Sequence, residues 1–308
     1  MHTLKVFLFG KFHLQIGEQT LNSFDARKGQ ELFCYLLLHK DRSHAREVLA
    51  DILWEDSSTA QSKSYLRKAL WQLQVILDKF VEPDKSDVLL VEPNYIQINP
   101  EGILWLDISI CERAFNLVQG IRGQDLNDQQ AEMVREAVDL YCGDLLEGWY
   151  QSWCLYERER FQYIYLALLD KLMNYCEARH QYEAGIAYGM AALRYDPARE
   201  HTHRRLMRLK YLTGDRTAAL RQYKQCLATL DEELGVAPTQ QTLALVERIQ
   251  ADTLDSLNPV PSEMPAAKIP SLPTILSHLE NIYDCLEHTQ YQIKADIQTI
   301  KQMINNHG

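Results

Sequence analysis

The sequence has no run of 18 consecutive apolar residues, so it offers no segment that is long and apolar enough to cross a membrane. Its first ten residues carry no basic head before a short apolar stretch at 6–9, which does not fit a secretory signal peptide. Glycine and proline are sparse, with 13 and 10 among 308 residues, while 46% of the residues are hydrophobic. This composition excludes a disordered chain and is typical of a globular protein, which we expect to be cytoplasmic and free of membrane contact.

Clustered cysteines and an excess of positive charge are lacking as well. The seven cysteines are odd in number and none belongs to a C-x-x-C pair, so we expect reduced thiols that are mostly buried. The formal net charge is −10, and most of it lies beyond residue 100. An acidic total argues against diffuse nucleic-acid binding over the whole surface, but it allows one compact module with local basic character.

The motifs of the common enzyme classes are also missing. The sequence has no phosphate-binding P-loop, no dinucleotide fingerprint, no H-E-x-x-H and no G-x-S-x-G. His201 and His203 are two residues apart on a predicted helix, so they point away from each other and fit packing or hydrogen bonding better than metal binding. The acidic pair Glu157 and Glu159 looks like a solvated helix face. We therefore predict no catalytic residue, no metal site and no cofactor.

The first hundred residues change their hydrophobic period several times, as a small mixed fold does. The predicted elements are strands at 5–9, 12–16 and 19–21, helices at about 26–39, 45–54 and 60–80, and a hairpin formed by 88–91 and 95–98. Strands, three helices and a terminal hairpin follow one another in the order of a winged helix.

Residues 102–251 are predicted to be helical throughout, and they contain an internal repeat. The segment 182–186 recurs at 216–220, an offset of 34 residues at which Ala184 aligns with Ala218. This is the period of tetratricopeptide-like helix pairs, in which small residues allow two helices to approach closely.

The C-terminal region begins with a linker, because five of the ten prolines lie between 255 and 273. A heptad pattern of about four and a half repeats follows and predicts a dimeric coiled coil. The predicted dimer contacts are Ile275, Leu279, Ile282, Leu286, Ile293 and Ile300. A single amphipathic helix that folds back onto the repeat domain is the alternative.

The fold is therefore predicted to be mainly α with a small β component. Its predicted parts are a winged helix at 1–100, a tetratricopeptide-like domain at 101–252, a proline-rich linker at 253–272 and a coiled-coil helix at 273–308.

The helix predicted at 60–80 has two faces of different character. Leucines and a phenylalanine form a buried stripe, and polar and cationic residues gather opposite, as a helix in the major groove requires. The residues expected to read bases are Gln61, Ser64, Lys68 and Gln72, and those expected to contact phosphates are Lys63, Arg67, Arg27 and Lys28. Trp71 lies on the same face, where it could pack on a thymine methyl or be covered by another domain. A merely solvated helix face is the alternative.

Two sets of short motifs are recognisable. The first set is Arg27-Lys28, YLLL at 35–38, Arg46, Leu49, Leu53-Trp54 and LRKAL at 66–70. It resembles the winged-helix domain of the SARP (antibiotic regulatory protein) transcriptional activators, which has an architecture like the OmpR/PhoB effector domains. The second set is YCGDLLEG at 141–148, Trp153, Asp196-Pro197, Glu200, HRRLM at 203–207, Gly214, Ala219-Leu220, Tyr223 and ELGVAP at 233–238. It resembles the bacterial transcriptional activator domain, an all-helical tetratricopeptide-like module.

This resemblance implies a cytoplasmic, dimeric activator that binds double-stranded promoter DNA with helix 60–80. It also implies contact with RNA polymerase through the loop at about 55–59. The sequence departs from the family at Gln74-Val75, where a second arginine pair is common, and in the arginine-poor turn around Asn94. Each lost phosphate contact removes roughly one released counterion, so DNA affinity is expected to be modest or to depend on dimerisation.

Two other functions fit the sequence. One is a protein-interaction scaffold with a degenerate winged helix, which predicts that Trp71 is buried against the repeat domain or a partner. The other is a regulator that senses an unknown small-molecule effector in the repeat domain, near the aromatic residues Trp149, Trp153, Tyr156 and Tyr188.

Overall fold

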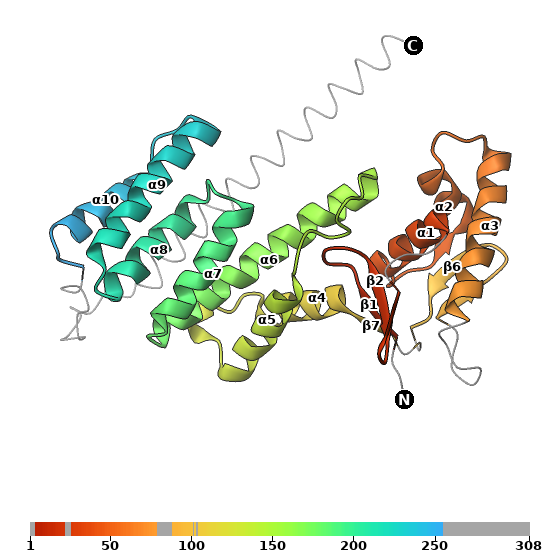
Figure 1. Cartoon of the computed structure of the whole chain (residues 1–308), viewed down its shortest axis with the longest axis horizontal. Helices are drawn as coiled ribbons and strands as arrows, with labels where there is room; N and C mark the ends of the chain where they lie inside the picture. Colours follow the sequence, from red (N-terminus) through yellow and green to blue (C-terminus); the bar gives the residue numbers. More distant parts are fainter. Residues whose placement is uncertain (1–3, 22–25, 79–87, 101, 103, 255–308) are drawn as a thin grey trace, which may run out of the picture. The chain divides into compact units, whose positions relative to one another are not determined.

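The computed structural model describes residues 4–21, 26–78, 88–100, 102 and 104–254, and residues up to Asp252 form one compact unit (Figure 1). The fold is mainly helical with a small β component at its N-terminal end, as predicted. The predicted coiled coil, nearly all of the predicted linker, Phe80 and Cys285 lie outside the described residues. No helix among the described residues has the length and hydropathy of a membrane span.

The N-terminal sheet has four short strands in the order β3-β2-β1-β7. Its strands are β1 (Leu4–Phe7), β2 (His13–Ile16), β3 (Gln19–Leu21) and β7 (Leu104–Leu106). The first three form an antiparallel meander, whereas β7 pairs parallel to β1 with Leu4 opposite Leu104.

The strand β7 corrects the prediction that residues 102–251 are helical throughout. It has only three residues, which is too short for a strand to show a period of two. Its hydrogen-bonding partner β1 lies about a hundred residues earlier in the chain. No local pattern in the sequence could therefore reveal it.

Three helices and a second small sheet complete the winged helix. They are α1 (Arg27–Leu38), α2 (Arg46–Leu53), α3 (Thr59–Leu77), and the strands β4 (His44–Ala45), β5 (Leu89–Val91) and β6 (Tyr95–Ile98) in the order β4-β6-β5. The helices and the hairpin lie at about the predicted positions, whereas the two-residue strand His44–Ala45 was not predicted. Helix α1 is buried from Gly29 to Leu38 and forms the centre of this core. Gly29 allows close packing, because a Cβ atom there would lie only 3.3 Å from the Ala69 carbonyl oxygen of α3.

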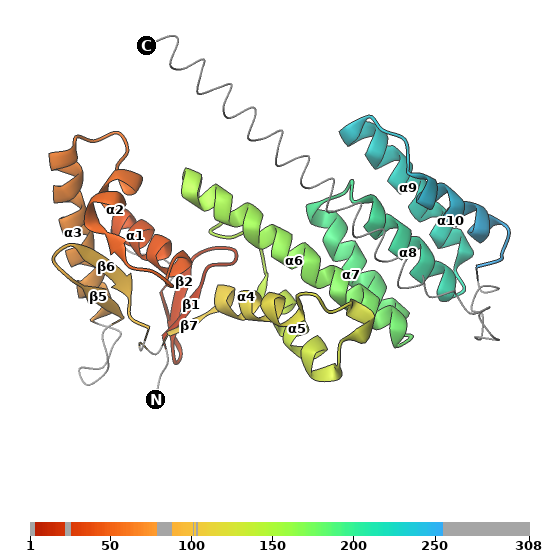
Figure 2. The same ribbon diagram turned by 180° about the vertical axis from the view of Figure 1, so that it is seen from behind.

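The remaining helices stack in chain order from α6 onward, as both views show (Figure 1, Figure 2). They are α4 (Asp107–Val118), a 3-10 turn (Gly123–Asp125), α5 (Asp128–Leu140), α6 (Ser152–Ala178), α7 (Tyr182–Tyr195), α8 (Glu200–Leu212), α9 (Arg216–Leu234) and α10 (Gln240–Gln250). Helices α7 and α9 begin at Tyr182 and Arg216, which confirms the offset of 34 residues.

The close approach between helices occurs one position away from the aligned alanines. Ala184 is exposed, whereas Gly185 and Gly189 are buried. A Cβ atom on Gly189 would lie 2.6 Å from a methyl carbon of Leu206 on α8. Glycine is therefore required by the packing of α7 on α8.

Residues 8–10 continue β1 and attach the sheet to the helical region. The N–H of Leu146 donates to the Leu8 carbonyl at 2.8 Å, and the N–H of Gly10 donates to the Asp144 carbonyl at 2.9 Å. Buried residues from the sheet, the winged helix and α4–α6 belong to one hydrophobic core. The winged helix thus packs continuously against the helices that follow it.

Two predictions about individual residues have different outcomes. The six described cysteines are free thiols and five of them are buried, while Cys142 is exposed. Glu157 is not on a solvated face as predicted, because it is 5% exposed and its carboxylate lies 2.6 Å from Arg160 Nε. The ion pair with Arg160 allows Glu157 to be buried, and the spacing of residues in the sequence did not reveal this pairing.

Candidate DNA-binding surface

Helix α3 presents one apolar and one polar face. It begins after Ser58 and buries Leu66, Leu70, Leu73 and Leu77 against the core, as the sequence predicted. These positions are three or four residues apart and therefore share one face of the helix. The packing of this stripe on α1 and α2 fixes which side chains face outward.

The outward face of α3 carries the residues that were predicted to read DNA. The exposed side chains are Gln61, Lys63, Ser64, Arg67, Lys68 and Trp71, and Gln72 is half-buried. The scaffold alternative predicts that Trp71 is buried against the repeat domain or a partner. In this structure Trp71 is 64% exposed, so the repeat domain does not bury it. An indole that is free on a polar face remains available for contact with a partner molecule.

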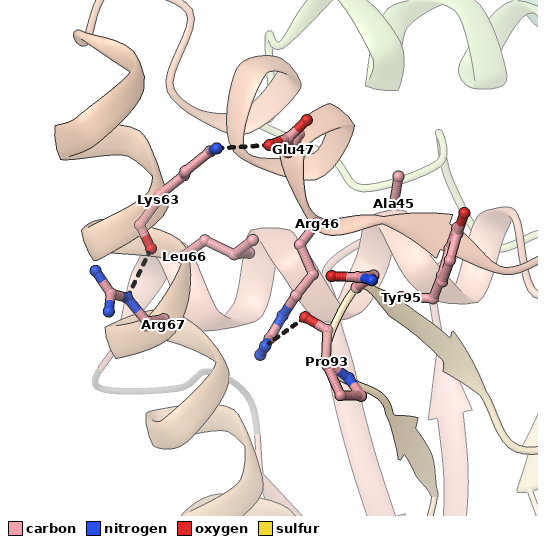
Figure 3. Close-up of a pocket in the computed structure, with 9 residues that line it drawn as sticks. Ala45, Arg46, Glu47, Lys63, Leu66, Arg67, Pro93 and Tyr95 are labelled. Atoms are coloured by element: carbon pink, nitrogen blue, oxygen red, sulfur yellow. Dashed lines mark hydrogen bonds and ion pairs between the residues drawn. The ribbon is translucent and has the colours of Figure 1, made fainter.

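A hollow of about 570 Å³ lies beside this face, between α3, the start of α2 and the turn of the β5–β6 hairpin (Figure 3). Leu66 is 2% exposed and is one of the residues that line the hollow. The hairpin turn contributes Pro93, Asn94 and Tyr95. Two strand pairs, β4–β6 and β5–β6, hold this turn in place.

Arg46 anchors the hairpin to the start of α2. Its backbone N–H donates to the Asn94 carbonyl at 2.9 Å, and its Nη1 donates to the Pro93 carbonyl at 3.3 Å. Its Nε is buried and has no hydrogen-bond partner within the described part of the chain. Arg46 therefore places a positive charge beside the arginine-poor hairpin. The sequence does not show that these two segments lie close together.

The opposite wall of the hollow comes from α3. Lys63 Nζ lies 2.5 Å from Glu47 Oε1 of α2, and Arg67 Nε donates to the Lys63 carbonyl at 3.3 Å (Figure 3). The hydrogen bond and charge of Lys63 lower the pKa of Glu47 from its ordinary value, so this carboxyl group is ionised at neutral pH. The hollow thus holds three cationic side chains and one carboxylate.

Arg27 and Lys28 were predicted to contact phosphates, and the structure places them on the first turn of α1, outside this hollow. Arg27 is exposed and lies 3.5 Å from Glu31. Lys28 Nζ donates to Glu31 at 2.6 Å and to the Leu53 carbonyl at 2.9 Å. Lys28 is therefore engaged in contacts within the winged helix.

Lys28 lines a different hollow of about 350 Å³, which includes the loop between α2 and α3. The start of α6 contributes Gln151, Ser152 and Trp153 to this hollow. The exposed carboxylates of Glu55 and Asp56 lie on the same loop. This is the segment for which the sequence predicted contact with RNA polymerase.

The aromatic residues considered for an effector site differ in burial and do not all lie together. Trp149 and Trp153 meet edge to face with their ring centroids 6.2 Å apart, whereas Tyr156 is 70% exposed. Tyr188 belongs to α7 and packs against the buried core.

The described residues contain no group of three His, Cys, Asp or Glu side chains placed to hold a metal ion. His201 contacts the Asp170 carboxylate at 3.0 Å, and His203 Nε2 lies 2.8 Å from the Pro197 carbonyl. Both histidines therefore make structural hydrogen bonds, in agreement with the sequence analysis.

Comparison with known proteins shows what this chain is similar to. Residues 106–250 match the bacterial transcriptional activator domain. Regulatory protein AfsR of Streptomyces coelicolor is 25% identical over 222 residues, which are 72% of this chain and 22% of AfsR, so the chain spans about a fifth of that relative. The fold is similar to Mycobacterium tuberculosis EmbR, solved in complex with a low affinity phosphopeptide. The TM-score is 0.61 at 20% identity, and the match covers 82% of this chain and 66% of EmbR.

Proposed function

We propose that this chain is a transcriptional activator of the SARP type, which reads promoter DNA with the exposed face of α3; the match of residues 106–250 to the bacterial transcriptional activator domain and the similarity to AfsR support this proposal. The observation that carries the proposal is the polar face of α3 beside the hairpin. Gln61, Ser64 and Lys68 are exposed there, and the helix core is fixed by buried leucines. Amide, hydroxyl and ammonium groups on one helix face can donate to and accept from base edges in the major groove.

Phosphate contacts would come from both sides of this helix. Lys63 and Arg67 extend from α3 itself, and Arg46 lies at the hairpin turn. Arg27 is exposed at the start of α1 and adds a further cation. These side chains position a protein on the duplex and make its affinity dependent on salt.

Contact with RNA polymerase and dimerisation belong to the same proposal. The loop between α2 and α3 supports the first, because Glu55 and Asp56 are exposed there. The heptads at 273–308 support the second, through the contacts named in the sequence analysis. We retain the division into a winged helix at 1–100, an activator domain at 101–252, a linker and a dimerisation helix, and we place the protein in the cytoplasm.

The test is selection of binding sites by the chain from a library of random DNA duplexes. The proposal predicts enrichment of a defined motif, present as a direct repeat if two chains bind together. The variant Trp71→Ala and the double variant Gln61→Ala with Gln72→Ala should alter or weaken that motif, since their side chains face the groove. Failure to enrich any motif at low salt would favour the scaffold alternative.

A further inference from the structure

The hollow beside α3 contains one acidic side chain among three cationic ones. Glu47 is 74% exposed and its carboxylate lies 2.5 Å from Lys63 Nζ, while the side chain of Lys63 is 45% exposed. Arg46 and Arg67 line the same hollow and contact backbone carbonyl groups. Within the described residues, neither guanidinium forms an ion pair with a carboxylate.

This arrangement leaves room for one more anion. Arg46 and Arg67 line the hollow without a carboxylate partner among the described residues, and Lys63 shares its charge with a single exposed carboxylate. A phosphate group has oxygens enough to accept hydrogen bonds from several such donors. Glu47 would then stand close to a second negative charge, which weakens binding of that anion.

We propose that this hollow receives one phosphate of the DNA backbone, and that Glu47 acts as a resident counter-ion which the phosphate must displace from Lys63. The proposal rests on the DNA-binding function proposed above, and it identifies Glu47 as a residue that lowers the affinity for DNA. A backbone phosphate is favoured over a free one, because the hollow opens between α3 and the hairpin, the two elements expected to flank a DNA strand (Figure 3).

The ion pair affects binding far more than folding. Exposed pairs of this kind contribute little to stability, so Glu47→Gln should fold like the parent chain. In the parent chain Glu47 already offsets much of the charge of Lys63, so contact of Lys63 with a phosphate releases few of the cations condensed on the DNA. Without Glu47 the full charge of the same lysine neutralises the phosphate, and about one more cation is released from the DNA.

The experiment is a double-mutant cycle on a duplex obtained from the selection described above. Glu47→Gln, Lys63→Ala and the combined variant are compared with the parent chain by fluorescence anisotropy between about 50 and 200 mM salt. Glu47→Gln is expected to bind about five-fold more tightly, with a salt slope steeper by about one. Lys63→Ala should cost about two-fold in the parent chain and about ten-fold in the Glu47→Gln background.

Glu132 provides a matched control. Its carboxylate is also 74% exposed and lies 2.6 Å from Arg135 of α5, so Glu132→Gln removes an equivalent charge outside the hollow. Equal affinity and slope for Glu47→Gln and Glu132→Gln would overturn the inference while the DNA-binding function stands. If no variant and no parent chain binds any duplex, the proposed function itself fails.

A further experiment distinguishes a phosphate of the DNA backbone from a free phosphate ion. Inorganic phosphate replaces chloride at constant ionic strength during the titration of Glu47→Gln. The inference predicts that the added affinity of this variant persists, since a backbone phosphate is held by the rest of the duplex. Loss of the added affinity in inorganic phosphate would assign the hollow to a free anion and overturn the proposal.

Discussion

The carboxylate of Asp107 accepts a hydrogen bond from the backbone N–H of Leu8 at 2.7 Å, although the two residues are 99 positions apart. The same oxygen accepts the N–H of Phe9 at 2.8 Å, and the other oxygen accepts the N–H of Ile108 at 2.7 Å. Asp107 is the first residue of α4 and is fully buried. One side chain therefore links the N-terminal sheet to the start of the activator domain.

Removal of this link should destabilise both parts together. Asp107→Ala leaves three buried N–H groups without their acceptor, and we expect a loss of about 3 kcal/mol in the free energy of unfolding. Urea denaturation at neutral pH measures it, with the exposed Asp51→Ala on α2 as control. A single cooperative transition at lower urea is expected. An unchanged midpoint would show that the three hydrogen bonds contribute nothing.

The same residue should make stability depend on pH. Desolvation by burial raises the pKa of Asp107 from 3.8 to about 6, against the opposing effect of its backbone hydrogen bonds. Between pH 4 and pH 6 the folded state therefore keeps the Asp107 proton that the unfolded state has released. The contribution of this protonation to the free energy of unfolding is complete below about pH 4 and is lost as the pH rises through about 6.

Relative to Asp107→Asn, the free energy of unfolding of the parent chain should fall by up to about 3 kcal/mol between pH 4 and pH 7. Denaturation series for both proteins across this range check the prediction. A difference that is constant with pH, or one that grows with rising pH, would contradict it.

Gly189→Ala tests the packing of α7 on α8. Alanine normally favours a helix interior by about 1 kcal/mol, but here its Cβ would lie 2.6 Å from a methyl carbon of the buried Leu206. Overpacking should outweigh helix propensity and destabilise the protein by about 2 kcal/mol. Thermal denaturation would measure this, and Glu183→Ala at an exposed position of the same helix is the control. Stabilisation by Gly189→Ala would show that the neighbouring side chains relax freely.

The predicted coiled coil is tested by charge substitution in its seam. Leu279→Lys combined with Leu286→Lys places cations at two apolar heptad positions, which should convert a dimer into a monomer. Light scattering after size-exclusion chromatography measures the mass, and the same variant should bind a direct-repeat duplex about ten-fold more weakly. A parent chain that is already monomeric at the concentrations used would contradict the prediction.

Much of the winged helix could be predicted because its signals are local. The leucine stripe of α3 has the spacing of one helix face, and the hairpin strands flank the turn at Pro93-Asn94. The polar face of α3 follows from the same periodicity, which is why most of the predicted contact residues are exposed.

Features that depend on distant partners were not visible in the sequence. Strand β7 exists because it pairs with β1, and Glu157 is buried because Arg160 neutralises it. The position of Arg46 beside Pro93, and the ion pair of Glu47 with Lys63, arise from folding of α2 against α3 and the hairpin. A single sequence shows such residues as ordinary surface charges.

Binding of DNA by α3 is tested by the salt dependence of duplex binding in Arg67→Ala combined with Lys68→Ala. If α3 binds DNA, affinity falls by at least about ten-fold and the salt slope becomes shallower by about two. Lys224→Ala, an exposed lysine on α9, should leave both quantities unchanged. Equal affinity and equal slope in the double variant and the parent chain would contradict the claim.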